Sequence, residues 1–151
     1  MTPPQTDPAM TIRPLPSLVT KEYRTLARIA GRALITALRN EPNEMVIGAL
    51  LSNPRLTEED LLLLCNTSSS PKVLTLAGQS ERWRTRSSVR LALARNRSTP
   101  LALSVSLLPG LSESDLRDLS QHQSLPQALR SAASRLLLER RRATALETRR
   151  A

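Results

Sequence analysis

A short phrase that recurs along this chain constrains its fold more than any other feature. An aliphatic segment ends at an asparagine, and a proline follows: residues 46–54 read VIGALLSNP and residues 89–100 read VRLALARNRSTP, 43 residues further on. Looser copies of the break fall at Asn66 and His122. Repetition at about 40–47 residues is typical of stacked helix pairs that bury their apolar faces only against their neighbours. The sequence therefore predicts an all-α fold, a short α-solenoid of about eight helices.

The residue types available for a core favour the same fold class. The 151 residues include no Phe, one Trp, one Tyr and only four Gly. An aliphatic core suits thin, layered helix packing. No Asn-Gly or Asp-Gly pair stands between alternating apolar residues, so the usual β-hairpin signal is absent from the sequence.

Prolines and helix-capping residues place the expected helices. Prolines at 42, 71, 100 and 126 fall where a helix would begin, and a missing N–H does little harm there. We expect Gly78 and the pair Pro109-Gly110 to end helices. The expected helices span residues 20–39, 42–51, 57–66, 71–77, 81–95, 100–108, 113–121 and 126–139. Apolar spacing places seven leucines in the core: Leu50, Leu62, Leu91, Leu103, Leu107, Leu119 and Leu136.

The two ends of the chain differ in composition from its middle. Residues 1–17 contain five prolines and little apolar content, which predicts a disordered tail. Residues 18–142 form the expected helical-repeat domain. Residues 143–151 lose the apolar stripe and are expected to form a basic mobile tail.

The stretch from Val46 to Leu138 resembles bacterial HEAT-like repeats and the leucine-rich-repeat-variant group. Those repeats alternate short helices around Asn-Pro or Asn-x-x-x-Pro corners, and the matching segments here are residues 46–54, 89–100 and 116–126. Arg97 stands where the first copy has its proline, so the repeats are not identical. The resemblance implies a curved helical scaffold and brings no catalytic residue with it.

Residues that could carry chemistry are few. Cys65, the lone cysteine, lies in an apolar run and is expected to be a small buried side chain, and His122 is expected to satisfy free carbonyls at a helix end. The carboxylates at 58–60 and 113–118 fit first helical turns, and no glycine-rich phosphate loop exists. We therefore expect no catalytic residue, no metal site and no cofactor, with an enzyme of glycosylase or hydrolase type as the least favoured alternative.

Positive charge is concentrated in one band of the sequence. The formal net charge is +9, and residues 82–97 hold six arginines and no acidic residue around the only tryptophan. If this band is helical, Arg82, Arg86 and Arg90 share one face. Trp83 is expected to anchor the helix in the core rather than to stack on a ligand. The residues predicted to bind a partner are Arg82, Trp83, Arg86, Arg90 and Arg97.

These features predict a non-enzymatic cytoplasmic adaptor that binds a protein partner, and an acidic one, through its arginine-rich face. The alternative is a nucleic-acid-binding protein that contacts the phosphate backbone. An acidic band at residues 41–81 and the scarcity of lysine and aromatic residues count against nucleic acid. No apolar run is long enough to predict membrane insertion.

Overall fold

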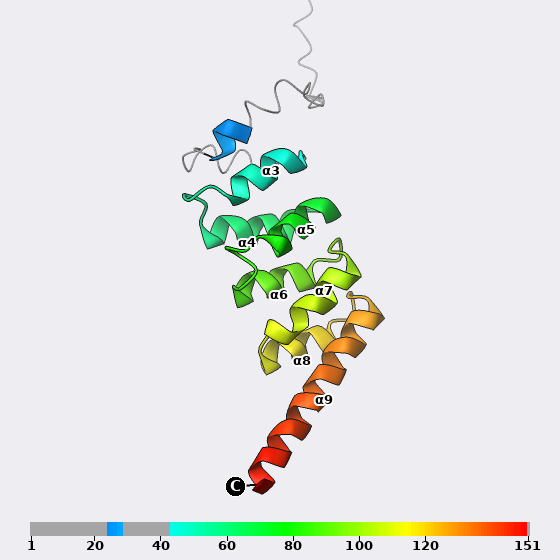
Figure 1. Ribbon diagram of the computed structural model, residues 1–151. Coiled ribbons are helices and arrows are strands. Elements are labelled where there is room, and N and C mark those ends of the chain that lie inside the picture. Colours follow the sequence, from blue (N-terminus) through cyan, green and yellow to red (C-terminus); the bar gives the residue numbers. More distant parts are fainter. Residues whose placement is uncertain (1–23, 29–42, 151) are drawn as a thin grey trace, which may run out of the picture.

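A computed structural model describes residues 24–28 and 43–150, and within these ranges the regular structure is entirely helical (Figure 1). Most of the predicted helix 20–39 and the predicted tail 1–17 lie outside the described residues. Residues 24–28 are helical. The remaining elements are α3 (Glu44–Leu51), α4 (Glu58–Thr67), α5 (Pro71–Gln79), α6 (Ser87–Arg95), α7 (Leu101–Leu107), the 3-10 turn η1 (Leu108–Gly110), α8 (Glu113–Gln121) and α9 (Gln127–Arg150).

Short polar side chains begin four of these helices. Asn43 and Ser70 accept hydrogen bonds from backbone N–H groups in the first turns of α3 and α5. Thr57 opens α4 with a reciprocal capping box, and its hydroxyl also donates to the Asp60 carboxylate at 2.7 Å. Ser112 opens α8 in the same way. These caps satisfy N–H groups that have no partner inside the helix, so they fix where each helix starts.

The predicted helix 81–95 is wrong in its first third. Residues 81–85 form a turn, and α6 begins only at Ser87. The Trp83 indole is buried and donates its N–H to the carbonyl oxygen of Leu51 at 3.3 Å. Reaching that carbonyl draws the segment off a helical path, so a distant contact overrides the local helical preference.

Two further helix ends differ from the prediction. Gly78 does not stop α5, which runs to Gln79; its missing side chain instead admits Leu103, whose methyl groups would lie 3.1 Å from a Cβ there. The last helix, α9, continues to Arg150 rather than ending near residue 139. Residues 141–150 are all exposed, so packing does not hold this part of the helix.

The helices stack in an elongated body, with the end of α9 projecting from it (Figure 1). Neighbours two helices apart pack against each other: α4 on α6, α6 on α8, α3 on α5, and α7 on α9. The most extensive packing between two described helices is that of the consecutive helices α8 and α9. The described helices therefore form layers built mainly from neighbours in sequence.

Two clusters of buried, mainly aliphatic side chains make up the core. The first draws on α3 to α6 and on Ala27, Leu56, Trp83 and Leu107. The second draws on Ala94 of α6, on α8 and α9, and on Leu125 and the residues around η1. Among the predicted core leucines, Leu50, Leu107 and Leu119 are buried. The other four are partly buried and pack against one of the clusters: Leu62, Leu91, Leu103 and Leu136.

The asparagines of the recurring phrase tie each corner to an earlier one. Asn53 is buried and donates its side-chain N–H to the Ala27 carbonyl oxygen at 2.7 Å. Asn96 donates to the carbonyl oxygens of Cys65 and Ser68 at 2.7 and 2.8 Å. The carbonyls of Cys65 and Ser68, at the end of α4, lack partners within the helix, and the Asn96 amide supplies them. The repeated asparagine therefore joins one helix to another through side-chain hydrogen bonds.

Two arginines also donate hydrogen bonds to backbone carbonyl oxygens at the connections between helices. Arg82 donates to the carbonyl oxygens of Asn53 and Leu56, at 2.7 and 3.0 Å. Arg140, on α9, donates to the carbonyl oxygens of Pro109 and Leu111, both at 2.8 Å. A guanidinium fork suits such paired acceptors. Two of the positively charged side chains of this chain thus hold neighbouring helices together.

Candidate functional site: an arginine-lined hollow beside α7

Trp83, one of the five residues predicted to bind a partner, is not on the surface. It is 3% exposed, and its ring packs in the first cluster. The prediction that it anchors the core is confirmed. A buried indole cannot stack on a ligand, so Trp83 is not a binding residue of this structure.

Arg82 also takes part in interactions within the fold. Besides its bonds to the corner carbonyls, its guanidinium lies 4.4 Å from the centre of the Trp83 ring. Because residues 81–85 form a turn, the expected helix face shared with Arg86 and Arg90 does not exist. The turn separates these three arginines and gives each a different neighbour.

The other three predicted residues lie at the surface or near it, as the exposed Arg82 also does. Arg86 stands at the N-cap position of α6, and its guanidinium lies 3.9 Å from the Glu58 carboxylate. Arg97 is exposed in the connection between α6 and α7. Arg90 is half-buried on α6, and its Nε donates to the backbone carbonyl oxygen of Arg84 at 2.5 Å. Of the predicted set, Arg90 lines a cavity.

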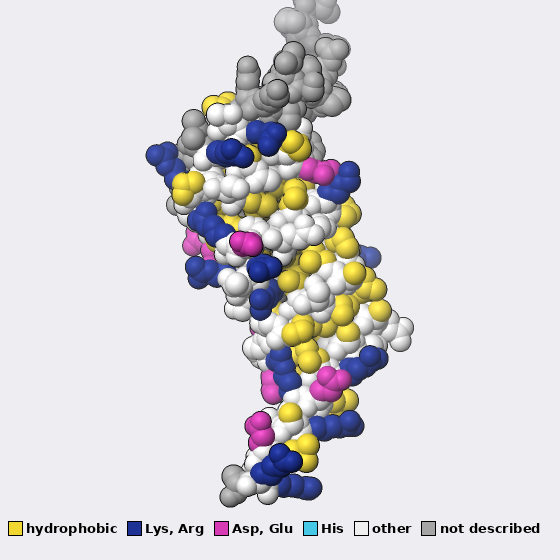
Figure 2. Space-filling model, in the orientation of Figure 1, with side chains coloured by type: hydrophobic (Ala, Val, Ile, Leu, Met, Phe, Trp, Pro, Cys, Tyr) yellow, Lys and Arg dark blue, Asp and Glu magenta, His cyan; other side chains and the backbone are white. Residues whose placement is uncertain are grey.

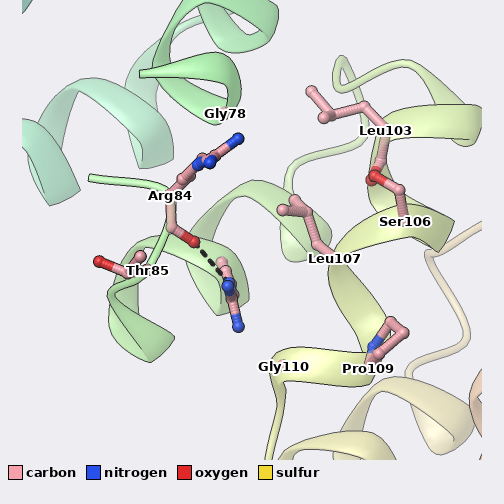
Figure 3. Close-up of a pocket in the computed structure, with 9 residues that line it drawn as sticks. Gly78, Arg84, Thr85, Leu103, Ser106, Leu107, Pro109 and Gly110 are labelled. Atoms are coloured by element: carbon pink, nitrogen blue, oxygen red, sulfur yellow. Dashed lines mark hydrogen bonds between the residues drawn. The ribbon is translucent and has the colours of Figure 1, made fainter. Parts of the chain in front are cut away.

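That cavity is a hollow of about 570 Å³ between the 81–86 turn and α7. Its lining comes from α5, the turn, α6, α7 and η1: Gly78, Arg84, Thr85, Arg90, Leu103, Ser106, Leu107, Pro109 and Gly110. In Figure 3, Arg84 extends toward Gly78 on one side, while Leu103, Ser106 and Leu107 of α7 lie on the other. We call this space the arginine-lined hollow.

The charge of the arginine-lined hollow is of one sign. Arg84 and Arg90 line it, and no carboxylate does. Neither arginine forms an ion pair with any of the described residues. The hydroxyls of Thr85 and Ser106 add neutral hydrogen-bonding groups. The hollow therefore presents guanidinium donors and two positive charges that no described carboxylate pairs with.

An apolar surface borders the hollow. On α7, Leu101 and Val105 are 43% and 37% exposed, and they lie one helical turn apart. Ala102 is also exposed, and Ser106, one helical turn further along α7, lies at the edge of the hollow. Figure 2 shows hydrophobic side chains gathered over α5 and α7, with arginine or lysine side chains alongside. We call the surface of Leu101, Ala102 and Val105 the α7 face.

The side chains considered for catalysis take other roles. Cys65 is fully buried, and burial raises the pKa of its thiol to about 12, so it is not an available nucleophile. His122 ends α8 with an exposed side chain, whose Nδ1 lies 2.8 Å from the Ser124 hydroxyl. Its ring therefore does not fill the carbonyl-satisfying role that the sequence predicted. Within the described ranges, no three His, Cys, Asp or Glu side chains are grouped to hold a metal ion.

Sequence reasoning missed Arg84 although it lies inside the arginine band. A helix through residues 81–95 puts Arg84 away from Arg82, Arg86 and Arg90, and only the turn brings it to Arg90. Gly110 was interpreted as a helix stop, whereas it also forms part of the hollow wall. The absence of any acidic residue between 82 and 97 was the one sequence signal that pointed to this site.

Comparisons with protein-family models, curated proteins and solved structures find no match to this chain. No helix in the described part of the chain has both the length and the apolar character needed to cross a membrane.

Proposed function

We propose that this protein is a non-enzymatic α-solenoid of HEAT-like helix pairs that binds an acidic protein partner. One observation carries the proposal: α7 has an exposed apolar face on one side, and on another side it lines a hollow with two arginines and no carboxylate. Exposed aliphatic groups offer area to bury, and unpaired arginines select an acidic partner and steer its approach.

The packing supports the solenoid assignment. Helices two apart in sequence stack on each other, and side chains at the corners bond to carbonyls of the corner two helices earlier. Such near-neighbour contacts are what a repeat array requires.

A protein partner fits the charge distribution better than nucleic acid does. Arg82 and Arg140 bond to backbone carbonyls, and Arg86 and Arg95 pair with carboxylates. The arginine band is thus broken up rather than aligned along one track for a phosphate backbone. The only tryptophan is buried and cannot stack on a base.

The test is affinity capture from native lysate, with and without nuclease. The bait proteins are the wild type, Val105→Glu, the double variant Arg84→Glu/Arg90→Glu, and Arg97→Glu as a single charge reversal outside the hollow. We expect an acidic protein that survives nuclease, is lost with the first two variants and is retained by Arg97→Glu. Circular dichroism of each bait checks that its helices are intact.

Two results would overturn the proposal. One is capture that is unchanged by reversal of Arg84 and Arg90. The other is capture abolished by nuclease, with an affinity that falls by about 0.9 log units per log unit of salt for each duplex phosphate neutralised. The second result would establish the nucleic-acid alternative.

A further inference from the structure

The arginine-lined hollow has the features of a built anion site rather than a chance depression. The Arg90 side chain is held in place by its bond to the Arg84 carbonyl and lies over Gly110. A Cβ atom at position 110 would collide with the Arg90 guanidinium. Gly110 has no positive φ, so its backbone does not require glycine. The Arg90 guanidinium occupies the space beside Gly110, and any side chain at position 110 would make it move.

From this geometry, we propose that the hollow binds a phosphoryl group carried on a side chain of the partner, an inference that rests on the proposed function. A phosphoryl group carries about −1.5 to −2 charge at pH 7 and three acceptor oxygens. One such group neutralises Arg84 and Arg90 together. A single carboxylate would leave about half of that positive charge uncompensated.

The donors of the hollow match that ligand. Each guanidinium has five N–H donors in a planar fork, and Arg90 spends one of them on the Arg84 carbonyl. Arginine forks pair with phosphate oxygens through two parallel bonds. The Thr85 hydroxyl is a further donor, whereas the Ser106 hydroxyl donates to the Leu103 carbonyl oxygen at 2.7 Å. No acceptor carboxylate in the lining competes with or repels the anion.

The walls of the hollow favour a phosphorylated side chain over a nucleotide. The lining includes no aromatic residue on which a base could stack. Across from Arg84 the wall is aliphatic, with Leu103 and Leu107. A volume of about 570 Å³ also exceeds what one phosphoryl group fills, since a water takes about 30 Å³ of liquid. The carrier side chain enters with the phosphoryl group, and its peptide continues onto the α7 face.

Isothermal titration of the full chain at physiological ionic strength tests the inference. The probes are inorganic phosphate and three nine-residue peptides of one sequence, with leucines flanking a central phosphoserine, serine or glutamate. The variants are Arg84→Gln/Arg90→Gln and, as a control that removes the same charge elsewhere, Arg97→Gln/Arg117→Gln. A third variant, Gly110→Ala, leaves the charge unchanged and displaces the Arg90 guanidinium.

We expect the phosphoserine peptide to bind at least about tenfold more tightly than its serine and glutamate counterparts. Both Arg84→Gln/Arg90→Gln and Gly110→Ala should weaken phosphoserine binding by about tenfold or more, and the control pair by less than about threefold. Inorganic phosphate should bind more weakly than the peptide but show the same order among the variants. Unchanged helical circular dichroism confirms that each variant is folded.

Equal binding of the glutamate and phosphoserine peptides would overturn the phosphoryl assignment and leave the acidic-partner proposal standing. Equal loss in the control pair would overturn it as well, because the effect would then be general screening of charge. If the phosphopeptide fails to bind while lysate capture still depends on Arg84 and Arg90, the inference fails and the proposed function holds.

Discussion

Replacing Asn96 tests whether the recurring asparagine holds the helices together. Its side chain makes three hydrogen bonds: two from Nδ2, to the carbonyl oxygens of Cys65 and Ser68, and one accepted by Oδ1 from the Ser98 N–H at 2.8 Å. Each such bond contributes about 1 kcal/mol net, so three give about 3 kcal/mol. Asn96 is half-buried, and water can replace part of what is lost. We expect Asn96→Ala to lower the free energy of unfolding by about 1.5–3 kcal/mol.

A second variant sharpens the test by changing only the donors. Asn96→Asp keeps an acceptor for the Ser98 N–H but turns a negative oxygen toward the two carbonyls. At pH 7 it should cost at least as much as Asn96→Ala, because two buried acceptors then face a like charge. The assay is urea denaturation followed by circular dichroism, with the midpoint and the slope fitted for each variant.

Asn66→Ala is the matched control. The sequence presents Asn66 as another copy of the break, yet it lies inside α4 with its side chain exposed. Alanine is the better helix former, so this change should be neutral or stabilising by a few tenths of a kcal/mol, about 0.5 at most. If Asn96→Ala costs no more than Asn66→Ala, the side-chain ties between corners do not stabilise the fold and the reasoning fails.

Three further outcomes are expected from the same denaturation assay. Leu119→Ala should cost about 2–5 kcal/mol because Leu119 is fully buried, whereas Leu138→Ala, at a position 53% exposed, should stay within about 0.5 kcal/mol; similar losses at both sites would contradict the core assignment. Gly48→Ala should stabilise by about 0.5–1 kcal/mol, because a Cβ there meets no described atom within 4 Å; a loss would mean that the site is occupied. Burial raises the pKa of Cys65 from 9.0 to about 12, so the unfolded chain loses this proton first. Stability should therefore fall from about pH 9 upward by at most about 1.4 kcal/mol per pH unit, and Cys65→Ala should lack that slope; parallel pH profiles would refute it.

Features set by neighbouring residues were predictable from the sequence. Ser70 and Pro71 begin α5, and Thr57 caps α4, because capping and proline geometry depend on a few adjacent groups. The regular spacing of leucines placed all seven predicted positions in or against the core, and three of them are buried: Leu50, Leu107 and Leu119. These features depend on the local sequence and not on which helices pack against each other.

Features set by distant contacts were not predictable. The turn at 81–85 depends on Trp83 reaching Leu51, 32 residues earlier in the chain, and on Arg82 reaching the corner after α3. Without that turn, Arg84 and Arg90 do not face the same space. The candidate hollow therefore lies in the predicted band of sequence, with Arg90 in the predicted set and Arg84 left out of it.

The extension of α9 has a local cause that the apolar pattern does not report. Residues 140–150 are mostly Arg, Ala, Leu and Glu, which form helix readily without burial. The prediction followed the apolar stripe and stopped where the stripe stopped. Intrinsic helix preference carries the helix further.

The division of the core into two clusters has a consequence for how the protein opens. Helix α6 supplies Leu93 to one cluster and the adjacent Ala94 to the other, so it forms a wall common to both. Losing either cluster alone leaves α6 packed on its other side. In native-state hydrogen exchange, the amides of α6 should therefore exchange last. The amides of α3 and α8 should exchange through separate local unfolding reactions of lower free energy. A domain of this kind unfolds from both ends toward its middle helix.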